Sequence, residues 1–183
     1  MFEISFINIE LLYTIIYLLI RIICWCKNKR IDFKRELILL LMYINLFVII
    51  RFTLFPFKIV EGKIQTLTFD INNIFPLRIN LKPFIRLKDY VNKSDMWFNT
   101  LGNIAMFIPT GIILPIIYKK LDKSWKVILV GMFISLDIEI IQLLFRARSS
   151  DIDDFIFNTL GVLIGYLIYY LSKKIIKYRQ TIN

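Results

Sequence analysis

Five long apolar runs constrain this chain more than any other feature of its sequence. They cover residues 4–25, 36–55, 99–118, 126–145 and 152–171. A helix needs about 20 mainly apolar residues to cross about 30 Å of hydrocarbon. Since 57% of the 183 residues are apolar, little chain remains for a separate water-soluble domain. We therefore predict an all-α membrane protein, a five-span helical bundle that forms a single domain.

Short clusters of basic residues between these runs indicate the orientation of the chain. The clusters lie at residues 27–35, 119–126 and 173–179. Cytoplasmic segments of membrane proteins carry an excess of lysine and arginine. We therefore expect a multi-pass protein of the cell membrane, with its N-terminus outside and its C-terminus in the cytoplasm.

Residues 56–98 join the second and third runs and are too polar and too often interrupted to cross the membrane. They nevertheless carry large apolar side chains, among them Phe69, Phe75 and Leu81, which do not suit a free loop. We expect an extracytoplasmic segment that lies in the membrane interface. Its lysines and arginines would attract anionic headgroups, so anionic membrane lipids are the expected partners.

Charge and composition exclude several classes of function. The formal net charge is +10, but the basic residues form short clusters between apolar runs, unlike a nucleic-acid-binding face. The chain contains no histidine, which excludes a Ser-His-Asp triad and a histidine-ligated zinc site. Any acid–base chemistry would depend on carboxylates or lysine. Cys24 and Cys26 are expected to be reduced and cytoplasmic.

With this orientation, polar residues of the last three runs fall at one depth toward the outside. Their helical spacings place each set on one face of its helix. Together with Ser135, the predicted site residues are Asn99, Asn103, Glu139, Gln142, Arg146, Arg148, Asp151, Asp153, Asp154 and Asn158. A carboxylate in hydrocarbon costs on the order of 3 kcal/mol, so Glu139 needs a polar partner or water. We predict a shared polar pocket that opens to the outside.

Two further expectations concern helix packing. Small residues at Gly102, Gly161 and Gly165 would allow close approach of the helix backbones. Glu10 and Arg51 lie in the first two runs, and we expect them to form a structural ion pair.

At these polar residues the sequence resembles the VanZ-like family of small membrane proteins. Four motifs carry the resemblance: N-L-x-P-F at 80–84, N-x-x-G-N-x-x-x-F-x-P-x-G at 99–111, S-x-x-x-E-x-x-Q at 135–142, and R-x-x-D-x-D-D-x-x-x-N-x-x-G-x-x-x-G at 148–165. They span about half of the chain. The family is known in Gram-positive bacteria for an association with resistance to the lipoglycopeptide teicoplanin. The resemblance therefore implies a role in glycopeptide resistance or cell-envelope modification.

The first of two alternative functions is that of a hydrolase or transferase acting on a lipid-linked envelope substrate. The candidate catalytic residues are Glu139, Asp154 and Asp151, and Arg146 and Arg148 would hold a phosphate. The amides of Asn99, Asn103, Gln142 and Asn158 would orient the substrate.

No cofactor is evident, although Asp151, Asp153 and Asp154 could hold a hard divalent cation through oxygen ligands. The second alternative is a non-catalytic protein that binds an anionic envelope lipid, a lipid-anchored polymer or a lipoglycopeptide. The sequence leaves the choice between enzyme and binding protein open.

Overall fold

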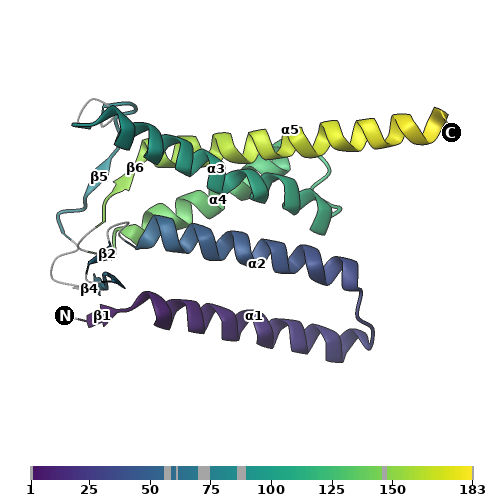
Figure 1. Cartoon of the computed structure of the whole chain (residues 1–183), viewed down its shortest axis with the longest axis horizontal. Helices are drawn as coiled ribbons and strands as arrows, with labels where there is room; N and C mark the ends of the chain where they lie inside the picture. The colour runs from purple at the N-terminus through teal and green to yellow at the C-terminus, as the bar shows by residue number, and fades with distance from the viewer. Residues whose placement is uncertain are drawn as a thin grey trace. The chain divides into compact units, whose positions relative to one another are not determined.

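The computed structural model of the chain describes residues 2–55, 59–60, 62–69, 75–85, 90–145 and 148–182. Within these residues the fold is predominantly helical (Figure 1). The helices are α1 (Phe6–Asn28), α2 (Phe33–Leu54), α3 (Lys93–Ile117), α4 (Ser124–Gln142) and α5 (Ile152–Ile182). The predicted all-α membrane fold is confirmed.

Four of the helices in the described part of the chain, α1, α2, α3 and α5, are long and apolar enough to cross a membrane. The 19-residue helix α4 corresponds to the expected fourth span. At about 1.5 Å per residue its length suits the hydrocarbon thickness. It carries Lys126, Asp137 and Glu139, however, so its crossing of the membrane stays a prediction.

Several helices extend beyond the boundaries expected from hydropathy. Helix α3 begins at Lys93 instead of residue 99, and α5 continues to Ile182 instead of ending at residue 171. Lysine and arginine are good helix formers, so a helix continues beyond its apolar part. By contrast, α4 ends at Gln142, three residues before the expected end.

Short strands accompany the helices in the described residues. Their bounds are β1 (Phe2–Ile4), β2 (Ile59–Val60), β3 (Lys63–Ile64), β4 (Leu67–Phe69), β5 (Ile79–Asn80) and β6 (Ser150–Asp151). The pairs β1 with β4, β2 with β3, and β5 with β6 each form a two-stranded sheet. The described residues before α3 in the segment 56–98 are thus strands and turns, and their position in a membrane interface stays a prediction.

The chain divides into two compact units. The first contains residues 1–79 and 138–150, and the second contains residues 80–137 and 151–183. Helix α4 contributes residues to both. Each unit is described separately below.

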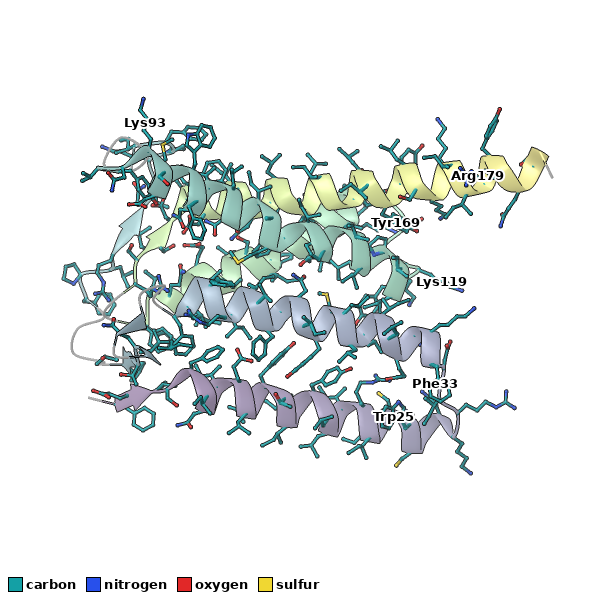
Figure 2. All side chains as sticks on the ribbon, viewed as in Figure 1. Trp25, Phe33, Lys93, Lys119, Tyr169 and Arg179 are labelled. Atoms are coloured by element: carbon teal, nitrogen blue, oxygen red, sulfur yellow. The ribbon has the colours of Figure 1, made fainter. Side chains whose placement is uncertain are left out.

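In the first unit, α1 and α2 form an antiparallel hairpin (Figure 1). Asp32 caps the start of α2, because its carboxylate accepts hydrogen bonds from the backbone N–H groups of Lys34 and Arg35. Figure 2 shows Trp25 and Phe33 on the two sides of the turn. The connection between the two helices has four residues, and both helix ends beside it are capped, by Lys29 on α1 and by Asp32 on α2. The caps hold the turn of the hairpin in place.

Aromatic and charged side chains join the two helices of the hairpin. The rings of Tyr13 and Tyr43 stack with centroids 4.9 Å apart. The Tyr43 hydroxyl also lies 2.7 Å from the Thr14 hydroxyl. Near the turn, Arg21 Nε donates to Glu36 Oε2 at 2.8 Å in an ion pair.

The expected ion pair between Glu10 and Arg51 is not formed, so that prediction is wrong. The guanidinium of Arg51 lies over the rings of Phe6 and Phe52, at 5.6 and 5.5 Å from their centroids. Such cation–π contacts are stabilising where water is scarce. Both charges are visible in the sequence, but the rotation of each helix about its axis is not.

In the second unit, α3 and α5 run side by side in the same direction (Figure 1). Three glycines permit the close approach. A Cβ added at Gly111, Gly161 or Gly165 would lie 2.1–2.3 Å from a backbone carbonyl oxygen of the other helix. The expectation for Gly161 and Gly165 is confirmed. Gly102 has nothing within 4 Å of such a Cβ, and its predicted packing role is wrong.

Replacement of Gly165 by alanine is predicted to destabilise the second unit. The new methyl group would lie 2.1 Å from the carbonyl oxygen of Ile108, and overpacking of this kind costs about 1–3 kcal/mol. Thermal unfolding of the purified protein in detergent should show a clear fall in Tm. The matched change Gly102→Ala adds the same methyl group in open space and should leave Tm unchanged or slightly raised.

Candidate functional site

The first turn of α5 holds the segment that contains β5. Asp151 Oδ1 accepts hydrogen bonds from the backbone N–H of Asp153 at 3.1 Å and from Asn80 Nδ2 at 3.0 Å. Asp153 Oδ1 accepts from the backbone N–H of Phe84 at 2.7 Å. Carboxylates are favoured at a helix N-terminus, where backbone N–H groups lack intrahelical partners. Asp151 and Asp153, both buried, therefore act as anchors.

The anchored segment has an irregular backbone. Asn80 Oδ1 accepts from the backbone N–H of Lys82 at 3.2 Å, which makes a local turn. Phe84 has a φ of 62°, in the left-handed region that bulky residues rarely adopt. The hydrogen bond to Asp153 offsets part of the cost of this conformation.

Asp154 contacts α3, whereas Asp151 and Asp153 contact the segment that contains β5. Its Oδ1 accepts a hydrogen bond of 2.6 Å from Asn103 Nδ2 on α3. Asn103 is buried, with 6% of its surface exposed, and Asp154 is half-buried. A hydrogen bond to an ionised group is about twice as strong as one between neutral groups. This pair links α3 to α5 with a carboxylate.

One turn further along α5, Asn158 Nδ2 donates to the hydroxyl of Ser135 on α4 at 3.0 Å. Both residues are buried. Among the described residues, Asn158 Oδ1 has no hydrogen-bond partner. In the second unit, polar side chains of α3, α4 and α5 thus meet as two pairs, Asn103 with Asp154 and Ser135 with Asn158.

Asn99 has a separate partner. Its Nδ2 donates to the hydroxyl of Tyr90 at 2.6 Å, although Asn99 lies one turn from Asn103 on the same helix. Because Tyr90 precedes α3, this hydrogen bond joins the segment before α3 to the second turn of the helix.

Glu139, Gln142 and Arg148 belong to the first unit. Gln142 Nε2 donates to the carbonyl of Thr53 at 2.8 Å, and Arg148 Nε donates to the carbonyl of Leu54 at 2.7 Å. The last carbonyls of a helix lack intrahelical partners. These two side chains therefore cap the C-terminus of α2. Glu139 is buried, with 4% of its surface exposed.

Arg146, a predicted phosphate ligand, lies outside the described residues. The predicted site residues are divided between the two units, and the single shared pocket stays a prediction. In the described part of the chain, no group of three acidic or cysteine side chains could hold a metal ion. The aspartates of α5 instead accept hydrogen bonds from amides, and cation binding stays a prediction.

Two contributions to these contacts were missed by the sequence argument. Asn80 belongs to the N-L-x-P-F motif, and its amide holds Asp151. The carbonyls at the end of α2 could not be predicted as acceptors, because every residue supplies a carbonyl and no residue type indicates its role. The N-L-x-P-F motif at residues 80–84 is the sequence feature from which a role for Asn80 could have been predicted.

The fold and these contacts define a class of small multi-helix membrane protein with buried polar contacts between its helices, one of them between a carboxylate and an amide. A sequence model described as VanZ/LLP1 matches residues 39–173. The chain belongs to the VanZ/LLP1 family. The matched range includes all the site residues above and excludes α1.

A curated relative, Protein VanZ from Enterococcus faecium, is 32% identical over 112 residues. The alignment covers 61% of this chain and 65% of that protein, so this chain spans less than two thirds of the relative. No solved structure matches the chain.

The anchoring role of Asp153 predicts a local effect of its removal. In Asp153→Ala, the backbone N–H of Phe84 loses its acceptor, and its hydrogen exchange should accelerate at least about tenfold, since hydrogen bonds to charged groups contribute about 1.5–3 kcal/mol. Exchange of residues 80–85 can be followed by mass spectrometry. Asp154→Ala is the matched control and should leave this amide protected, because Asp154 binds Asn103 instead.

Proposed function

We propose that this protein contributes to resistance against teicoplanin, or to a related modification of the cell envelope, through the polar site of its second unit. Family membership and the similarity to Protein VanZ of Enterococcus faecium support this role. The observation that carries the proposal is the hydrogen bond between Asn103 and the half-buried carboxylate of Asp154. Ionisable groups between membrane helices are costly and usually functional.

The proposed site faces the outside of the cell. In the second unit, Lys119 and Arg179 lie toward one end and Lys93 lies at the other (Figure 2). The Asn103–Asp154 pair lies in the half of α3 and α5 that is remote from Lys119 and Arg179. If the two basic clusters are cytoplasmic, this pair is near the outer leaflet.

The ligand we propose is a lipid-linked envelope component or a lipoglycopeptide. Its polar part would contact Asp154, and its lipid chain would remain among the apolar surfaces of α3 and α5. The supporting features are the acceptors Asp154 and Asn158 Oδ1 and the surrounding hydrocarbon-length helices.

A second candidate is a hydrolase or transferase. It is favoured by the way in which Asn103 fixes one oxygen of Asp154, because a general base must be held in position toward the proton it removes. If the protein is such an enzyme, its carboxylate must be at position 154. A carboxylate at position 103 with an amide at position 154 would not support the reaction.

Asp154→Asn is predicted to abolish protection in a teicoplanin susceptibility assay. The change keeps the size of the side chain and removes the charge that Asn103 contacts, so susceptibility should rise to that of cells lacking the protein. Membrane levels of the variant are the control for expression. Full protection by Asp154→Asn would contradict a role for the carboxylate. Glu139→Gln tests the buried carboxylate of the first unit in the same way.

Exchanging the two residues of the Asn103–Asp154 pair distinguishes a need for a carboxylate at position 154 from a need for the contact between the helices. The double change Asn103→Asp with Asp154→Asn restores one carboxylate and one amide across the same 2.6 Å contact. We expect a folded protein, with a Tm near that of the parent, that does not protect. Restored protection would show that the pair serves only to join α3 and α5.

Orientation can be tested with single cysteines in a background where Cys24 and Cys26 are serine. A membrane-impermeant maleimide added to intact cells should label Lys93→Cys and should not label Tyr178→Cys. Both should react after the cells are opened. The reverse pattern would place the site of the second unit on the cytoplasmic side.

A further inference from the structure

Two glutamates of the α1–α2 hairpin differ in their partners. Glu36 is paired with Arg21. Glu10 is buried, with 6% of its surface exposed, and neither of its carboxylate oxygens has a hydrogen-bond partner among the described residues. Of these two glutamates, Glu36 is compensated and Glu10 is not.

The surroundings of Glu10 are aromatic. One turn before it, the ring of Phe6 contacts the rings of Phe47 and Phe55, with centroids 5.8 and 5.2 Å away. On the other side, Tyr13 stacks on Tyr43 of α2. Glu10 therefore lies on the face of α1 that packs against α2, between two aromatic contacts.

The charged and titratable groups on this side of the hairpin are few. Tyr13 follows Glu10 by three residues on α1, and α2 supplies Tyr43 and Arg51. Glu3 on β1 is exposed and accepts a hydrogen bond from Thr66. An ionised carboxylate in such surroundings would lack compensation, so Glu10 is expected to be neutral and protonated.

Arg51 lies beside the turn of α1 that precedes Glu10. Its guanidinium lies over the ring of Phe6, which is one turn from Glu10, and Nη1 donates to the carbonyl of Phe55 at 3.4 Å. This hydrogen bond is long and therefore weak. A negative charge on Glu10 would attract the guanidinium.

We propose that Glu10 is a proton-binding site within the α1–α2 hairpin, and that Arg51 is the counter-charge of its ionised form. The ligand is the proton itself. Residue 10 precedes the part of the chain that the family model matches, and the proposal does not depend on the proposed function.

The test is modification by N,N′-dicyclohexylcarbodiimide, a hydrophobic reagent for protonated carboxyl groups. A carboxyl oxygen adds to the carbodiimide carbon, and the carboxyl proton moves to a nitrogen. In the purified full-length protein, peptide mass spectrometry should find the adduct on Glu10 at about pH 6 and several-fold less of it at about pH 9. Glu36 is the matched control and should remain unmodified, because Arg21 keeps it ionised.

The expected loss of the adduct in Glu10→Gln confirms the assignment of the modified residue. A folded protein that is unmodified at Glu10, or modified equally at Glu10 and Glu36, would overturn the proposal. Equal modification of Glu10 at both pH values would also overturn it.

Arg51→Gln tests the counter-charge. Without the guanidinium the ionised form of Glu10 loses its stabilisation, so modification should persist to higher pH than in the parent. Arg51→Lys keeps the positive charge and should restore most of the parent profile. An unchanged profile in Arg51→Gln would overturn the assignment of Arg51.

Discussion

The close packing of α3 against α5 is the constraint on which the second unit depends. Gly111, Gly161 and Gly165 replace side chains by backbone contact along the interface. In hydrocarbon there is no hydrophobic driving force for helices to associate, so van der Waals contacts and interhelical hydrogen bonds must hold them together. The short side chain of Asn103 reaches Asp154 because the two backbones approach closely. The packing and the polar site are consequences of the same geometry.

The acidic residues at and just before the start of α5 have different roles, because neighbouring positions of a helix differ in direction by about 100°. Asp151 and Asp153 bind Asn80 and the backbone of Phe84, whereas Asp154 binds α3. The motif is divided into an anchor and a pair between helices. Among the described site residues, Asp154 is the carboxylate that is partly exposed, and the proposed function therefore centres on its pair with Asn103.

The first unit satisfies its polar groups by another route. The carbonyls at the end of α2 would be costly to leave unpaired in an apolar environment. Gln142 and Arg148 bind these carbonyls, and their predicted contact with a substrate stays a prediction. In the same unit, Arg21 compensates Glu36 but Arg51 does not contact Glu10 as an ion pair. The hairpin therefore leaves one acid to be neutralised by a proton.

Apolar length and basic clusters, read from the sequence alone, determined the class of protein and the positions of its helices. Helical spacing determined that Asn103, Asp154 and Asn158 lie on inward faces, since that period is a property of the backbone. The tertiary structure alone decided the partners: Asp154 for Asn103, Tyr90 for Asn99, and the carbonyl of Leu54 for Arg148. A partner depends on helix rotation and separation, which are set by side-chain packing across the whole interface and not by the local sequence.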